Sequence, residues 1–234
     1  MSSIKYFGHA TVLLTTESGK KIIIDPFLEG NPLCPDDCKE LDSLDMIVLT
    51  HGHADHASSA APLAKKHGAT IFATYELASL MAKEGVPEYQ IQFMNKGGTV
   101  EQDGIKVSLT NAYHSSSFDA SDGVTYYAGE ACGAVVTLES GKSIYHAGDT
   151  CLFDDMKLIA KEYTPEVALL PIGDRFTMGP KEAAEAAKLI KPKKAIPIHF
   201  GTFELLTGTP SEFASYLEGS GIEVLTLEPG QESN

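Results

Sequence analysis

Short apolar runs rich in β-branched residues recur along the chain, and they constrain its fold more than any other feature. Runs of this kind predict strands over residues 22–24, 46–50, 70–73, 105–109, 134–138, 143–145, 167–172, 195–198 and 222–227. Between several of them, Ala, Leu and Ile recur at three- and four-residue spacing, which predicts helices over residues 58–67, 76–84, 153–161, 181–190 and 211–218. Strands and helices mixed in this way indicate a layered α/β protein.

Four of the predicted strands end in a residue that can do chemistry. Asp25, His51, His146 and His199 each come directly after an apolar run. Loops at the ends of strands in a rigid sheet are where α/β proteins carry functional groups. We therefore expect these side chains to share one edge of the fold.

Length and charge narrow the classes of protein and partner. The 234 residues contain no low-complexity run, polar linker or short repeat, which predicts one domain over residues 1–234. A net charge of −14, from 18 Lys and Arg against 32 Asp and Glu, disfavours nucleic-acid binding. It is compatible with a small anionic substrate, because bound divalent cations make a local pocket positive. We expect no membrane association and a cytoplasmic location, because there is no long apolar stretch or signal-peptide pattern and only four cysteines.

A cluster of metal-ligand residues follows the predicted strand at residues 46–50. His51, His53, Asp55 and His56 lie within six consecutive residues. In an extended turn, His51 and His53 point the same way and reach one cation, while Asp55 and His56 address another at the following bend. The alternative is a solvated histidine-rich loop in which Asp55 caps a helix. The spacing favours half of a two-metal site.

The remaining ligands must come from elsewhere in the chain. His114, Asp149 and His199 are the candidates, because all three follow predicted strands. Alone, either histidine also fits a surface or hydrogen-bonded core position, and Gly148-Asp149 is a common turn pair. Two cations need more ligands than one loop provides, and a carboxylate is suited to bridging them.

These motifs, in this order, resemble those of the metallo-β-lactamase superfamily over nearly the whole chain. A narrower resemblance is to a family of largely uncharacterised metal-dependent hydrolases related to the ascorbate-6-phosphate lactonases. It is carried by four segments: Gly8-His9-Ala10, Ile24-Asp25-Pro26, residues 146–150 (HAGDT) and residues 171–180 (PIGDRFTMGP). The resemblance implies a four-layer αββα sandwich with a dinuclear site along one edge of the packed sheets.

The resemblance also implies roles for the ligands. His51, His53 and His114 would hold one metal, Asp55, His56 and His199 the other, and Asp149 would bridge them. A bridging water that loses its proton near neutral pH would be the nucleophile, so Asp55 and Asp149 are the predicted catalytic residues. The predicted substrate is a small ester, lactone or phosphoester. Imidazole and carboxylate ligands accept zinc or manganese, our leading candidates, and also iron or nickel.

Comparison within the superfamily separates this chain from several known activities. The dizinc β-lactamases commonly place a cysteine where Asp149 stands, and flavodiiron oxygen reductases generally have a glutamate where His53 stands. There is also no room for the extra domain of RNA-processing members. Two alternatives to hydrolysis stay open: an iron-dependent oxidoreductase such as a sulfur dioxygenase, and a metal-binding regulatory protein. The lactonase relatives make a homo-oligomer plausible.

Other residues have predicted roles around the metals. Asp25 is expected to accept a hydrogen bond from a metal-bound histidine, and His146 either does similar work or packs as a strand residue. By resemblance, His9 lies at the rim and contacts substrate or a ligand, unless it only makes a strand-end hydrogen bond. The loop at residues 173–180 either binds an anionic or carbonyl-bearing substrate or forms a plain helix entry; its candidate residues are Asp174, Arg175 and Thr177. Cys151 is predicted to be a buried neutral thiol.

Overall fold

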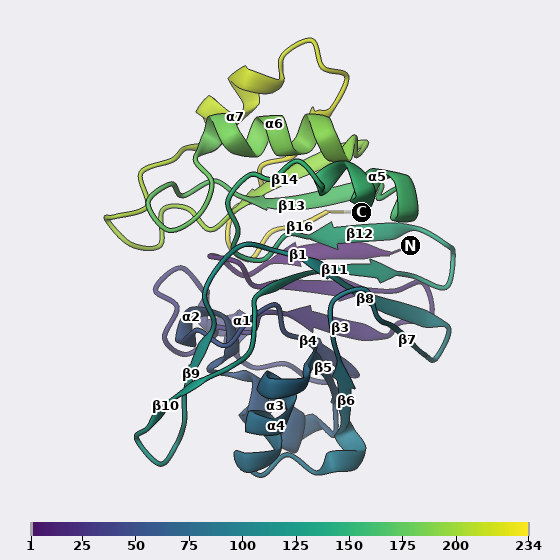
Figure 1. The fold of residues 1–234 in the computed structure, drawn as a ribbon, viewed down its shortest axis with the longest axis vertical. Helices are drawn as coiled ribbons and strands as arrows, with labels where there is room; N and C mark the ends of the chain where they lie inside the picture. The colour runs from purple at the N-terminus through teal and green to yellow at the C-terminus, as the bar shows by residue number, and fades with distance from the viewer. Residues whose placement is uncertain (1, 234) are drawn as a thin grey trace.

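Two seven-stranded sheets pack face to face, with helices on both outer faces (Figure 1). The computed structural model describes residues 2–233. The core between the sheets is built from alternate residues of their strands, such as Ile22 and Ile24 of one sheet and Ile196 and Ile198 of the other. This αββα layering confirms the predicted fold class.

The first sheet combines the N-terminal half of the chain with its C-terminal strand, in the order β16-β1-β2-β3-β4-β5-β6. β16, β1, β2 and β3 pair in antiparallel fashion, whereas β3 to β6 are parallel. The strands are β1 (Ser3–Tyr6), β2 (Val12–Thr15), β3 (Lys21–Ile24), β4 (Met46–Val48), β5 (Thr70–Thr74), β6 (Ile91–Met94) and β16 (Glu232–Ser233).

The second sheet repeats this pattern in the order β15-β14-β13-β12-β11-β8-β7. β7, β8, β11 and β12 are antiparallel, and β12 to β15 are parallel. The strands are β7 (Thr99–Gln102), β8 (Ile105–Asn111), β11 (Cys132–Thr137), β12 (Ser143–His146), β13 (Val167–Pro171), β14 (Lys194–Ile198) and β15 (Glu223–Val224). A separate hairpin of β9 (Ser117–Asp119) and β10 (Thr125–Tyr127) extends away from the sheets (Figure 1).

The helices bury their apolar stripes in two further cores, one on each outer face. Those against the first sheet are α1 (Asp36–Lys39), α2 (Ala54–Ala57), α3 (Ala60–His67) and α4 (Tyr75–Lys83), followed by the 3₁₀ turn η1 (Glu88–Gln90). Those against the second sheet are α5 (Met156–Tyr163), α6 (Pro180–Ile190) and α7 (Pro210–Leu217). No helix among residues 2–233 is long and apolar enough to cross a membrane.

The elements differ from the sequence prediction mainly at short or interrupted segments. The helix predicted over residues 58–67 begins later, at Ala60, because a separate turn of helix, α2, carries Asp55 and His56 before it. The strand predicted over residues 222–227 is only two residues long. The prediction for Cys151 was wrong: it lies in an irregular loop and its thiol is exposed, whereas Cys34, Cys38 and Cys132 are buried and free.

Candidate metal centre

Strand ends from both sheets bring together every histidine of the chain except His67. β1 leads to His9 and β4 to the loop and short helix α2 that carry His51, His53, Asp55 and His56. From the second sheet, β8 leads to His114, β12 to Asp149, and β14 to His199. The candidate ligands therefore lie at one edge of the sandwich, as the strand-end pattern predicts.

His51, His53 and His114 form a first group of possible donors, with ligand atoms within 4.8 Å of one another. His51 Nε2 lies 3.0 Å from His53 Nδ1. Gly52 between them is required by close packing, since a Cβ there would stand 2.7 Å from the Ser117 carbonyl oxygen. His51 is fully buried, whereas His53 and His114 are half-buried, so this group faces solvent on one side.

Asp55, His56 and His199 form a second group together with His9, again within 4.8 Å. The Nε2 atoms of His56 and His199 each lie 3.9 Å from Asp55 Oδ2. His56 and His199 are buried, and the Asp55 side chain is 31% exposed. Each group therefore has partly exposed members, His53 and His114 in the first and Asp55 in the second.

Asp149 lies between the two groups and approaches both of them. Its Oδ2 is 3.6 Å from His114 Nε2 and 4.0 Å from His51 Nε2 in the first group. In the second group, His199 Nε2 is 3.1 Å from Oδ2 and His56 Nε2 is 3.4 Å from Oδ1. Asp149 is therefore the one carboxylate among the described residues that lies within 4.0 Å of histidine nitrogens in both groups.

Several of these buried polar atoms have no hydrogen-bond partner among the described residues. They are His56 Nε2, Asp149 Oδ1 and both ring nitrogens of His199. Burying polar atoms without a partner costs about 1–3 kcal/mol each, so native proteins rarely do it. Donor atoms that share an ion through bonds of about 2.1 Å stand roughly 3–4 Å apart, and the distances to Asp149 fall in that range. Divalent cations fit this set of atoms.

A buried carboxylate orients the ligand loop from behind. Asp25 Oδ2 accepts hydrogen bonds from His56 Nδ1 at 2.8 Å and from the Thr50 hydroxyl at 2.6 Å, while its Oδ1 accepts from the Thr50 amide at 2.8 Å. The Thr50 hydroxyl is also 3.1 Å from His51 Nδ1. Asp25 therefore makes the contact predicted for it, whereas Thr50 was missed because a threonine at a strand end has no distinctive spacing.

His9 is buried more deeply than a position at the rim of the site implies. Its side chain is fully buried, with Nε2 3.0 Å from Asp55 Oδ2 and Nδ1 2.9 Å from the Thr202 hydroxyl. Its ring centroid is 4.0 Å from that of His199. Of the predicted alternatives, the structure shows contact with a candidate ligand. Thr202 was missed because the contact depends on how the β1 and β14 loops meet.

His146 holds the turn before Asp149 in place and makes no hydrogen bond to the ring of a candidate ligand. Its Nδ1 accepts a hydrogen bond from the Gly148 amide at 3.0 Å, so Nε2 carries the proton donated to the Ala10 carbonyl at 2.8 Å. These bonds tie the Asp149 turn to the His9 loop.

The loop before α6 packs its backbone against the centre, while its candidate side chains stay outside the two donor groups. The Met178 amide donates to the Thr150 carbonyl at 3.1 Å, and a Cβ on Gly173 would stand 2.2 Å from the His199 carbonyl oxygen. The three candidate residues of this loop, Asp174, Arg175 and Thr177, make no ion pair with another described residue; the first two are exposed and the third half-buried.

Burial and neighbouring charges set the ionisation of the site. Burial lowers the pKa of His9 to about 4 and holds the pKa of His51 well below its ordinary value. Burial alone would lower the pKa of His56, but the Asp149 and Asp25 carboxylates outweigh it and raise that pKa. Burial would raise the pKa of Asp149, but His56 and His199 hold it well below its ordinary value. Asp149 is therefore an ionised carboxylate.

The backbone is strained at the strand ends that form the centre. His9, Asp25 and His199 have positive φ values of 58°, 48° and 56°. Residues other than glycine rarely adopt this region, at a cost of about 1–3 kcal/mol each, and they do so mainly at functional sites. Here the strained residues are two members of the second donor group and the carboxylate that orients His56.

Comparison with known proteins was made by sequence and by structure. A family model described as a beta-lactamase superfamily domain matches residues 20–200. The chain is 48% identical over 231 residues to a UPF0173 metal-dependent hydrolase of Rubrobacter xylanophilus, covering 98% of this chain and 95% of that protein. It is 46% identical over 230 residues to one of Methanopyrus kandleri, covering 97% of each. The solved structure of Igni18, described as a novel metallo hydrolase from Ignicoccus hospitalis, has a TM-score of 0.88 at 34% identity, covering 99% of this chain and 97% of that one.

Proposed function

The chain belongs to the UPF0173 family of metal-dependent hydrolases in the β-lactamase superfamily, and from that premise we propose that it is a dinuclear hydrolase of a small ester, lactone or phosphoester. The observation that carries the proposal is the position of Asp149 between two groups of donors. A single-ion site would need only one of those groups.

We assign His51, His53 and His114 to one cation and Asp55, His56 and His199 to the other, with Asp149 shared. Imidazole and carboxylate donors accept zinc, manganese, iron or nickel and do not choose among them; zinc and manganese are our leading candidates. When bound, such cations lower the pKa of a coordinated water toward neutrality and polarise the bond under attack.

The chain's own residues prepare the site for this chemistry. Asp25 holds His56 in the tautomer that leaves Nε2 free for a cation, because Nδ1 carries the proton donated to the carboxylate. His9 holds Asp55 in place through Oδ2. Burial would raise the pKa of Asp55, but the hydrogen bond from His9 and the nearby His56 hold it below its ordinary value, so Asp55 is ionised. Its carboxylate is also partly exposed, and we therefore assign it the catalytic role of orienting the attacking water by accepting a hydrogen bond.

Substrate binding is assigned to the loop before α6. His9 is not assigned to it, because its side chain is fully buried and its two ring nitrogens contact Asp55 and Thr202. Arg175 is the chain's only arginine and stands exposed beside the centre, with Asp174 and Thr177 in the same turn. A guanidinium group there suits an anionic or carbonyl-bearing substrate. The lactone in our substrate class rests on the motif resemblance described above.

Two substitutions test the proposal against a panel of small esters, lactones and phosphoesters with the metal-loaded protein. Asp149→Asn and His56→Ala are expected to lower turnover by about 100-fold or more. Each removes an atom that would bind the metal, which should cost more than the roughly 10- to 100-fold typical of losing a residue that only orients a ligand. His67→Ala is the matched control, since His67 ends α3 away from the centre. Undiminished turnover in either site variant would contradict the assignment.

The same panel is assayed under anaerobic conditions. A hydrolase needs water alone as its second substrate, so turnover should be the same with and without oxygen. Turnover that requires oxygen and iron would replace hydrolysis with the oxidoreductase alternative.

A further inference from the structure

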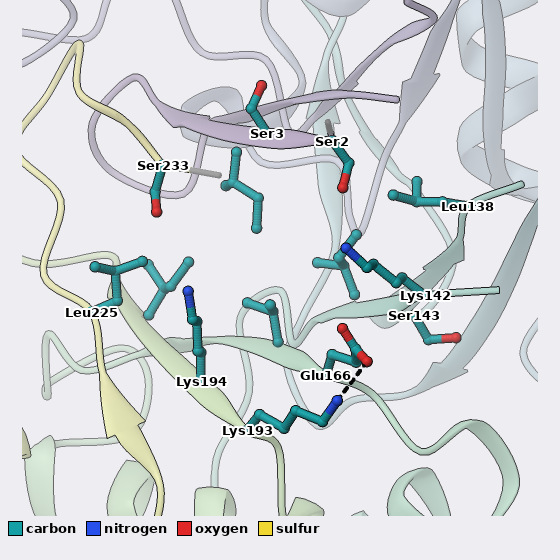
Figure 2. A pocket seen from close by; sticks show the side chains of 14 residues that line it. Ser2, Ser3, Leu138, Lys142, Ser143, Glu166, Lys193, Lys194, Leu225 and Ser233 are labelled. Atoms are coloured by element: carbon teal, nitrogen blue, oxygen red, sulfur yellow. Dashed lines mark hydrogen bonds and ion pairs between the residues drawn. The ribbon is translucent and has the colours of Figure 1, made fainter. Parts of the chain in front are cut away.

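A cavity opens at the edge of the sandwich opposite the metal centre. It measures about 150 Å³ and lies where the first residues of β12, β13 and β14 meet β1 and β16 (Figure 2). Lys194, the first residue of β14, lines this cavity, and the last residue of the same strand leads to His199. The two sites are therefore separated by the strand, roughly 13 Å at 3.3 Å per residue.

The floor of the cavity is apolar and continuous with the core between the sheets. Ile144 and Ile196 belong to that core, and Val167 and Leu225 pack against it. A cavity of this size lined by aliphatic side chains holds one benzene ring in another protein. The volume therefore suits an apolar group of about six carbons.

Two lysines with no acidic partner stand over this floor. Lys194 shares a strand face with Ile196 and Ile198, so it points toward the core between the sheets, where its neighbours on that face are apolar. Figure 2 shows the ammonium groups of Lys194 and Lys142 turned into the cavity from two sides. Within residues 2–233, neither has a carboxylate within 4.0 Å, whereas Lys193 pairs with Glu166 at 2.7 Å.

Local charge here is opposite to that of the whole molecule. The cavity is lined by Lys142, Lys193 and Lys194 and by one carboxylate, Glu166, so its lining carries a net charge of +2 in a chain whose net charge is −14. Glu166 pairs with Lys193 and also lies near enough to Lys142 to interact with its charge. A net positive lining above an apolar slot is complementary to a ligand with one anionic end and one apolar end.

We propose that this cavity binds a small amphipathic carboxylate, with its apolar body of about six carbons between the sheets and its carboxylate at Lys142 and Lys194. The site is separate from the hydrolytic centre and does not depend on the substrate assigned there. Each methylene moved from water into the slot tightens binding by about fourfold, and loss of one partly exposed ammonium group weakens it by about fivefold.

The test is calorimetric titration of hexanoate into the metal-loaded protein, compared with acetate and hexanamide. We expect one site per chain. Acetate should bind about 200-fold more weakly, because it lacks four methylenes, and hexanamide at least about fivefold more weakly, because it lacks the charge. Lys142→Met and Lys194→Met should each weaken hexanoate binding. Lys161→Met, an exposed lysine on α5, is the matched control that leaves affinity unchanged.

Binding at the metals is the competing result, because carboxylates also ligate cations. The titration is therefore repeated with Asp149→Asn, which should keep hexanoate binding intact. Binding that is lost in that variant, or that is unaffected by both lysine substitutions, overturns the proposal. The absence of hexanoate binding across the millimolar range overturns it as well.

Discussion

Asp25 shows how much of the centre depends on one side chain that is not a ligand. Its carboxylate accepts three hydrogen bonds, from His56, from the Thr50 hydroxyl and from the Thr50 amide, and it is fully buried. Its own φ of 48° is strained. The strain is retained because these bonds fix the ring of His56 and the start of the ligand loop at once.

Replacing Asp25 by Asn should therefore weaken the centre without removing a ligand. The amide turns one acceptor into a donor, which then faces either the Thr50 amide or both the Thr50 hydroxyl and His56 Nδ1. We therefore expect metal affinity to fall about 10- to 100-fold. The measurement is competition with a chromophoric chelator. Asp45→Asn is the control, because Asp45 also accepts a backbone hydrogen bond, from Lys21, but away from the centre. Equal metal affinity in the Asp25 variant and the wild type would contradict this role.

In the segment between β13 and α6, the backbone and the side chains have different roles. Its backbone is tied to the centre through the Met178 amide and the close approach of Gly173, while Asp174 and Arg175 extend into solvent. Both exposed residues have positive φ, at 65° and 44°. A loop held in this conformation presents its side chains beside the centre without closing it.

Arg175→Met should accordingly affect substrate binding and not the chemical step. For anionic substrates we expect KM to rise about tenfold, the effect of losing one charge-assisted hydrogen bond, with kcat nearly unchanged and neutral esters unaffected. Lys181→Met, at an exposed position in the first turn of α6, is the matched control. A fall in kcat with KM unchanged would show that this loop acts on the reaction itself.

Elements and ligands differ in how well sequence predicts them. Long apolar runs such as β13 and the helix that starts at Pro180 were predicted nearly to the residue, because their patterns are periodic and punctuated by proline. The short strands β1, β6 and β16 were not predicted, because their formation depends on pairing with neighbouring strands more than on local propensity.

The candidate ligands were predicted from the spacing of the cluster at residues 51–56, from positions after predicted strands and from the family resemblance, and the structure brings all of them together. The contacts of His9 were not predicted, because they require the β1 and β14 loops to meet: the His199 amide donates to the His9 carbonyl at 2.6 Å, and the Thr202 hydroxyl lies at His9 Nδ1. Those residues are about 190 positions apart in the chain, so no local pattern records the contact.

For the whole molecule, the centre joins the two sheets. His51 and Asp55 come from the first sheet, whereas His114, Asp149 and His199 come from the second. Cations bound between them would hold the halves together and offset the repulsion between the buried carboxylates. Metal occupancy should therefore stabilise the entire fold and not only the loops.

Removing the metals should lower the melting temperature. A ligand present at about 1,000 times its Kd contributes about 4 kcal/mol, which corresponds to roughly 8–15 °C for a chain of this size. Differential scanning calorimetry before and after chelation measures the shift, and zinc or manganese should reverse it. Asp149→Asn should show a much smaller shift. A melting temperature unchanged by chelation of a metal-containing protein would contradict this coupling.

Elemental analysis of the folded protein, purified without chelators and without a metal-affinity column and then incubated with zinc or manganese, tests the central claim most directly. The two groups of donors around Asp149 predict about two divalent ions per chain, and fewer in Asp149→Asn. No bound metal in a folded wild-type protein, before and after incubation, would show that the histidine cluster does not form the proposed centre.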